Sequence, residues 1–262
     1  MRKRITKRQV ILKKADKVLP KPLVTITELF SNEGLLLRRT TESGEPSDMT
    51  ETFSYDKKGQ LVLEKDDLGG RTRHTHESDG EGGSIETEIT DNNYGTQTTT
   101  THISKDNTRC HQTVDILLED GVTTVRMEES HSEFDINDSR ALVCIYYRET
   151  KRSIEDGATL SFEDHISYHR DGDKEVCVTE RTYGSGEKKT IVNTSWEEDG
   201  RDFFYIEEED GVVTKKGRTT LDSEFFLESS HEEEYGHFEE DGVMYDVRIT
   251  DEHFTHLEVQ SF

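Results

Sequence analysis

The sequence predicts an all-β protein: a long antiparallel meander of β-hairpins that forms a wide, twisted repeat sheet, single-layered or partly closed. The chain of 262 residues holds three Ala but 31 Thr, and alanine favours helices whereas threonine favours strands. Seven Asp-Gly dipeptides occur along it, a pair that suits two-residue type I′ hairpin turns. No proline follows Pro46, which suits uninterrupted strand ladders.

The core of this sheet is expected to be thin. Only 30% of the residues are apolar, 34% are charged and the formal net charge is −24. No run of about 18 apolar residues could form a membrane-spanning helix. The fold must therefore rest on limited apolar packing together with polar contacts.

A charge break near the N-terminus predicts two regions. Residues 1–22 carry nine Lys and Arg against a single acid, Asp16, and we expect them to form a basic N-terminal arm. Residues 23–262 then form a single elongated all-β repeat domain. The arm either lies against its own acidic body or binds nucleic acid or an anionic membrane.

The strand segments differ in polarity along the chain. Residues 84–90 and 96–102 are polar on one or both faces, as in a solvated strand. Residues 141–147 and 203–209 carry apolar side chains at consecutive positions, as in a more central strand. The C-terminal half is therefore expected to bury more surface than residues 70–115.

One segment, Phe53-Ser-Tyr55-Asp56-Lys-Lys-Gly59-Gln-Leu61, resembles a YD repeat of the Rhs type. The shared motif is Tyr55-Asp56, two variable residues and Gly59, followed by a small hairpin strand. Weaker echoes occur at residues 76–82, 168–172 and 196–200. In that family such repeats form β-hairpin strips that coil into shells around toxin domains, so the resemblance implies hairpin architecture.

No sequence pattern indicates catalysis. Neither a Gly-x-Ser-x-Gly elbow nor a Walker A loop is present, so we expect neither an enzyme nor a cofactor. His74 and His76 share one face of a strand, but two ligands without a third do not make a metal site. We therefore expect no metal.

The last third of the chain combines acidic runs with aromatic residues, which favours protein binding because charge steers the encounter and aromatic side chains anchor it. The leading hypothesis is a cytoplasmic, non-enzymatic inhibitor of the immunity type, which neutralises a basic toxin. The alternative is a structural or scaffold subunit of a larger assembly. No membrane is expected, and nucleic acid only at the arm. The candidate partner-binding residues are Trp196, Phe203, Phe204, Tyr205, Glu207, Glu208, Glu209, Glu232, Glu233 and Tyr235.

A cytoplasmic location is predicted from two further features. Residues 9–14 do not continue into an apolar leader. The three cysteines, Cys110, Cys144 and Cys177, are too few and too widely spaced for a disulfide framework.

Overall fold

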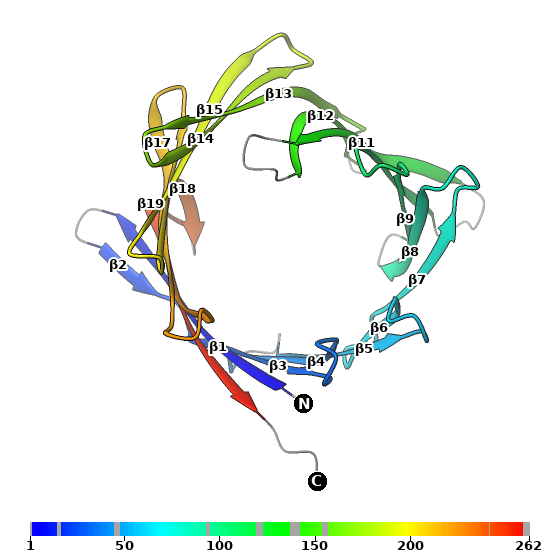
Figure 1. Ribbon diagram of the computed structural model, residues 1–262, viewed down its shortest axis with the longest axis horizontal. Coiled ribbons are helices and arrows are strands. Elements are labelled where there is room, and N and C mark those ends of the chain that lie inside the picture. The colour runs from blue at the N-terminus through cyan, green and yellow to red at the C-terminus, as the bar shows by residue number, and fades with distance from the viewer. Residues whose placement is uncertain are drawn as a thin grey trace. The chain divides into compact units, whose positions relative to one another are not determined.

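The computed structural model describes residues 2–14, 17–44, 48–92, 95–118, 123–136, 142–153, 157–240 and 242–258. Nineteen β-strands occur in these residues, and most of the pairings between them are antiparallel ladders of consecutive strands, as in hairpins (Figure 1). The predicted all-β meander of hairpins is confirmed. Among the described residues, no helix is long and apolar enough to cross a bilayer.

The chain divides into two compact units. Unit 1 comprises Met1–Thr52, His169–Cys177 and Ile191–Phe262, and unit 2 comprises Phe53–Tyr168 and Val178–Thr190. The strands wholly or mostly in unit 1 are β1 (Arg2–Lys14), β2 (Lys17–Pro20), β3 (Val24–Phe30), β4 (Leu36–Glu42), β5 (Met49–Tyr55), β15 (Lys188–Glu198), β16 (Asp202–Glu209), β17 (Val212–Leu221), β18 (Leu227–Glu240) and β19 (Val243–Glu258).

The first and last strands of the chain lie side by side in unit 1. β1 pairs with β19 from Arg2↔Glu258 to Lys13↔Val247, and it pairs with β3 along its other edge. Figure 1 shows this seam where the blue and red ends of the chain meet. An open meander would leave both terminal strands as free edges, so the expectation of an open repeat sheet is wrong at this point.

The basic N-terminal segment forms most of this seam. Residues 2–14 and 17–20 of the predicted arm are strands. Arg4 forms an ion pair with Glu28 on β3 at 2.6 Å, and Arg8 forms one with Glu252 on β19 at 2.5 Å. These acids from the body of the chain supply partners for the basic segment.

Unit 2 is a continuous hairpin meander. Its strands are β6 (Leu61–Asp66), β7 (Arg71–Ser78), β8 (Ser84–Asn92), β9 (Gly95–Ile103), β10 (Arg109–Leu117), β11 (Thr124–Ile136), β12 (Leu142–Arg152), β13 (Thr159–Asp171) and most of β14 (Lys174–Tyr183). Consecutive strands from β6 to β13 pair with each other. Each strand therefore presents alternate residues to the same face as the paired residues of its neighbours.

The turns bear out part of the sequence prediction. Asp199–Gly200 and Asp210–Gly211 have positive φ at both residues, 55° and 70° in the first and 50° and 80° in the second, as type I′ turns require. The turns expected at residues 120–121, 156–157 and 241–242 lie wholly or partly outside the described residues.

A second kind of turn explains the Tyr55-Asp56-x-x-Gly59 motif. Asp56 Oδ1 accepts hydrogen bonds from the backbone N–H groups of Lys58 and Gln60, at 2.7 and 2.9 Å, while Gly59 has a φ of 79°. These bonds lower the pKa of Asp56, the one from Gln60 most. The same pattern recurs in the turns that begin at Asp66, Asp79 and Asp222. The motif is thus a side-chain-capped hairpin turn.

The core is thin, as the composition predicts. Among the described residues, the buried large apolar side chains are Leu12, Ile116, Tyr245 and Ile249. Buried polar and charged residues outnumber them: Thr6, Glu28, His74, Ser130, Glu149, Asp164 and Thr179. Because a buried charge without a partner is costly, the contacts of these residues matter for the stability of the sheet.

Candidate functional site

The predicted partner-binding residues do not form one face. Cross-strand register pairs Trp196 with Phe204, and the neighbouring pair is Ser195 with Tyr205. Paired residues share a face and successive residues alternate. One side of the unit 1 sheet therefore carries Trp196, Phe204, Glu208, Glu233 and Tyr235. The other side carries Phe203, Tyr205, Glu207, Glu209 and Glu232.

Several of these side chains are engaged within the sheet. The Tyr205 hydroxyl donates to Glu232, and Lys216 lies 3.0 Å from Glu233. The hydroxyl of Tyr235, followed by Lys216 and His231, lowers the pKa of Glu233 to about 2. These contacts give the carboxylates a structural role in cross-strand pairing.

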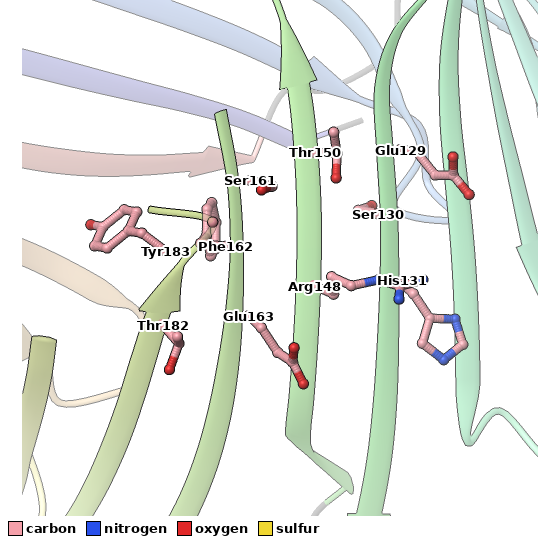
Figure 2. Close-up of a pocket in the computed structure, with 11 residues that line it drawn as sticks. Glu129, Ser130, His131, Arg148, Thr150, Ser161, Phe162, Glu163, Thr182 and Tyr183 are labelled. Atoms are coloured by element: carbon pink, nitrogen blue, oxygen red, sulfur yellow. The ribbon is translucent and has the colours of Figure 1, made fainter. Parts of the chain in front are cut away.

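A pocket of about 360 Å³ lies in unit 2, on strands that sequence analysis did not select (Figure 2). Strands β11, β12 and β13 form it together with residues 182–184, at the end of β14. Its lining residues are Glu129, Ser130, His131, Arg148, Thr150, Ser161, Phe162, Glu163, Thr182, Tyr183 and Gly184. Most of these residues are polar and bring hydroxyl, carboxylate, imidazole and guanidinium groups to the pocket.

One row across three strands supplies most of the charge. His131 on β11 is paired with Arg148 on β12, and Arg148 is paired with Glu163 on β13. Figure 2 shows Arg148 extending toward His131. Thr150 and Ser161 form the next pair on the same face, so hydroxyl groups lie beside the guanidinium.

Arg148 is the charged group in this lining without an ion pair to a described residue. The carboxylate of Glu129 lies 3.1 Å from His111 Nε2, and that of Glu163 lies 3.4 Å from His165 Nε2. Arg148 is also solvent-exposed. Its guanidinium can therefore bind an incoming anion without first losing an internal partner.

The opposite face of β12 carries a buried carboxylate with two partners on the same strand. The Tyr147 hydroxyl donates to buried Glu149 at 2.6 Å, and Lys151 lies 3.1 Å from the same carboxylate. Burial and the Glu149 hydrogen bond raise the pKa of Tyr147, so the phenol stays protonated and remains a donor. These contacts join residues of β12 to one another, on the face opposite Arg148.

A group with metal-ligand character lies elsewhere in unit 2. His74 and His76 of β7 are paired with Glu88 and Glu86 of β8, so the third and fourth ligands that the sequence did not show come from the neighbouring strand. His74, Glu86 and Glu88 place one nitrogen or oxygen atom each within 4.8 Å of one another.

No protein-family model and no curated protein sequence matches the chain. Among solved structures, a porin-like protein from Bacteroides uniformis is 12% identical, with 97% of each chain covered and a TM-score of 0.44. OccK2 (OpdF) from Pseudomonas aeruginosa is 8% identical over 98% of each chain, with a TM-score of 0.49. The outer membrane protein OpdK from the same organism is 7% identical, with 98% of this chain and 99% of that chain covered and a TM-score of 0.38.

These comparisons correct several sequence-based predictions. The resemblance to YD/Rhs-type repeats is wrong, because the similar structures include a porin-like protein and an outer membrane protein, and the Asp56 turn accounts for the motif locally. The cytoplasmic toxin inhibitor, its basic protein partner, the scaffold alternative and the absence of a membrane are contradicted as well, since these neighbours are porin-like and outer membrane proteins. At 12% identity or less they assign no role to any residue of this chain.

Proposed function

We propose that the protein is a non-enzymatic binding protein whose unit 2 pocket holds a small hydroxylated carboxylate, such as a sugar acid. The observation that carries the proposal is Arg148, an exposed guanidinium in a pocket where both neighbouring carboxylates, Glu129 and Glu163, have other partners. A guanidinium binds a carboxylate through two parallel N–H donors.

The size and lining of the pocket favour this class of ligand. A volume of about 360 Å³ lies at the small end of ligand pockets. Hydroxyl groups of Thr150, Ser161 and Thr182 line it beside Arg148, and each can both donate and accept. A ligand with one carboxylate and several hydroxyls would match these groups, whereas the two flanking acids would oppose one with several negative charges.

The test compares galacturonate with galactose, which lacks the carboxylate. Isothermal titration or ligand-observed NMR should show saturable binding of galacturonate and much weaker binding of galactose. Arg148→Gln should weaken galacturonate binding at least about tenfold, the loss of one charge-assisted hydrogen bond of ~1.5 kcal/mol.

Arg71→Gln on β7 is the matched control. Arg71 is also exposed and on a strand of unit 2, but it is not part of the pocket lining, so this variant should bind like the unmodified protein. Equal binding of the two sugars, or equal affinity of the Arg148→Gln and Arg71→Gln variants, would refute the proposal.

A further inference from the structure

His74 is a buried base without a hydrogen-bond partner. Its side chain is only 4% exposed, and neither Nδ1 nor Nε2 has a hydrogen-bond partner among the described residues. A buried polar group in this state destabilises the folded protein. Such a group in a native sheet requires an explanation, and an unseen ligand is one.

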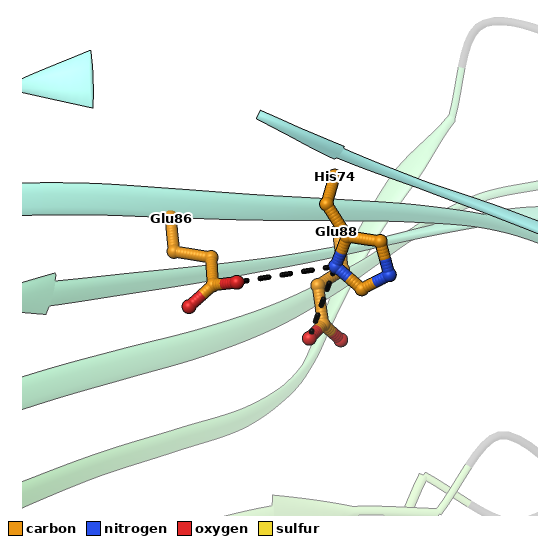
Figure 3. A group of neighbouring side chains, drawn as sticks. All are labelled: His74, Glu86 and Glu88. Carbon is orange, nitrogen blue, oxygen red and sulfur yellow. Dashed lines mark ion pairs between the residues drawn. The ribbon is translucent and has the colours of Figure 1, made fainter. Parts of the chain in front are cut away.

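Carboxylates lie near both ring nitrogens of His74, and Figure 3 shows the two beside Nδ1, Glu86 and Glu88. Nδ1 lies 3.6 Å from Glu88 Oε1 and 3.9 Å from Glu86 Oε1, and Nε2 lies 3.2 Å from Glu64 Oε1. The strand register brings these groups together, because Glu64 is paired with Thr72, two residues from His74, on the same face of the sheet.

This arrangement lacks a positive charge. Arg71 and Arg73 of β7 alternate to the other face, as does Lys65 of β6, which is paired with Arg71. Among the described residues of β6 to β8, the other basic side chain on the carboxylate face is His76. Three carboxylates thus surround a buried imidazole that no lysine or arginine on this face neutralises.

A neutral imidazole cannot satisfy this environment. It carries one N–H donor and one lone pair, whereas carboxylate oxygens only accept. If Nε2–H is directed at Glu64, the Nδ1 lone pair faces the oxygen lone pairs of Glu86 and Glu88. A cation between Nδ1 and these two oxygens converts that repulsion into three bonds.

The distances suit a small divalent transition metal. Zinc bonds of about 2.0–2.2 Å to nitrogen and oxygen put tetrahedral ligand atoms roughly 3.4 Å apart. The Nδ1–oxygen separations of 3.6 and 3.9 Å are within about half an ångström of that value. Glu86 and Glu88 are 39% and 45% exposed, so their carboxylates can adjust and solvent can reach the site.

Glu64 and His76 complete the surroundings. A metal-bound histidine usually donates its second N–H to a carboxylate, and the carboxylate near His74 Nε2 is that of Glu64, 3.2 Å away. His76 Nε2 lies 2.8 Å from the Leu61 carbonyl oxygen, which can only accept, so Nε2 must donate. In the neutral ring Nδ1 then carries the lone pair, 3.7 Å from the same oxygen of Glu86, and can serve as a fourth ligand.

We propose that unit 2 binds one Zn²⁺ ion through His74 Nδ1, Glu86 and Glu88, with Glu64 orienting the histidine. Imidazole and carboxylate together favour zinc over magnesium or calcium, which prefer oxygen ligands alone. The site is separate from the Arg148 pocket and does not depend on the function proposed for that pocket.

The experiment titrates the full chain, stripped with a chelator, with Zn²⁺ in isothermal calorimetry. One saturable site per chain is expected, and Co²⁺ should give the intense visible absorption of a tetrahedral site. Glu86→Gln and Glu88→Gln should each weaken Zn²⁺ at least tenfold. Glu64→Gln should weaken it about 10–100-fold, the usual effect of losing an outer partner.

Glu77→Gln is the matched control, since Glu77 is an exposed acid of β7 on the opposite face. It should bind Zn²⁺ like the unmodified chain. Far-UV circular dichroism checks folding, and because Glu86 and Glu88 are partly exposed, their variants test the site even if His74→Ala fails to fold.

Two outcomes would overturn the proposal. Equal Zn²⁺ affinity in the Glu86→Gln, Glu88→Gln and Glu77→Gln variants would indicate diffuse attraction to an acidic surface. Nitrogen-15 NMR showing that His74 is a doubly protonated imidazolium whose signals do not respond to Zn²⁺ would show that a proton, and not a metal, neutralises the cluster.

Discussion

The ion pair between Arg181 and Asp164 is expected to be a major source of stability in unit 2. Asp164 is 4% exposed. Arg181 donates to both of its oxygens at 2.8 Å and lies over the Phe162 ring, 4.1 Å from its centre. The Asp164 hydrogen bonds raise the pKa of Arg181, so the cation is present at every accessible pH.

Arg181→Met keeps most of the side-chain volume but removes the charge. Asp164 would remain buried without its cation, and breaking such a pair costs about 3–5 kcal/mol. The lost contact with Phe162 adds roughly 0.5–1 kcal/mol. Because Arg181 is 26% exposed, water can partly replace it, and we expect a total near ~3 kcal/mol, a large share of the ~5–15 kcal/mol that stabilises a typical domain.

Urea unfolding monitored by circular dichroism measures this loss. Arg170→Met is the control, because its pair with Glu175 is 66% and 57% exposed, and such surface pairs contribute less than about 1 kcal/mol. The double variant Arg181→Met, Asp164→Leu should recover much of the stability by removing the orphaned charge. A loss in Arg181→Met no larger than in Arg170→Met would refute the reasoning.

Two further predictions concern unit 1. Deleting residues 2–14 removes the strand between β19 and β3 and should abolish the cooperative unfolding of this unit in circular dichroism; an unchanged transition would instead support the independent arm of residues 1–22. The pKa of His231 is raised, mainly by its hydrogen bond to Asp251. The protonated ring therefore stabilises the fold fully below the unfolded pKa of about 6.5, and this stabilisation is lost as the pH rises through the higher folded pKa. The contribution is below about 1 kcal/mol, because the pair is exposed. Melting temperatures between pH 6 and 9 should fall less in His231→Gln, and identical pH profiles would contradict the assignment.

The sequence predicted the hairpins well because their signals are local. Alternation, the threonine excess and the Asp-Gly pairs all act within a few residues, and Asp199–Gly200 adopts the expected turn. The pairing of β1 with β19 had no such signal. It joins residues about 240 positions apart, and composition carries no information on which strands meet.

The carboxylate cluster around His74 was not predicted, because it depends on the register between two strands and no third ligand is near in sequence. A two-residue turn at Asp79–Gly80 would pair Ser78 with Glu81 and therefore His74 with Ile85. The actual turn spans Asp79 to Gly83, because Asp79 Oδ1 accepts from the N–H groups of both Glu81 and Gly83 at 2.8 Å.

Ser78 consequently pairs with Ser84, and His74 pairs with Glu88. The register shifts by three residues, and any odd shift moves every side chain to the other face. One aspartate in a turn thereby decides whether β8 presents isoleucines or glutamates to His74. The Asp-x-x-Gly pattern from Asp79 to Gly82 is a sequence signal for this longer turn, and it would have predicted the pairing of His74 with Glu88.

The buried charges of this thin-cored sheet follow one rule, and His74 is the exception to it. Glu28 pairs with Arg4 and Arg39, Glu149 with Lys151, and Asp164 with Arg181. Each of these buried acids therefore has a cation built into the sheet, on a neighbouring strand for Glu28 and Asp164 and on β12 itself for Glu149. Such partners offset the cost of burying a charge in a chain with few apolar residues.

At His74 the arrangement is reversed, because the buried group is a base and the charged groups around it are acids. The local excess of negative charge there is the same kind of excess that arginine or lysine neutralises at the other buried sites. Since no such residue is on this face of β6 to β8, the missing charge must come from solution, as a proton on the ring or as a metal ion. The separations of 3.6 and 3.9 Å from Nδ1 to two different carboxylates favour the metal, because a single proton on Nδ1 can form a short hydrogen bond with only one of them.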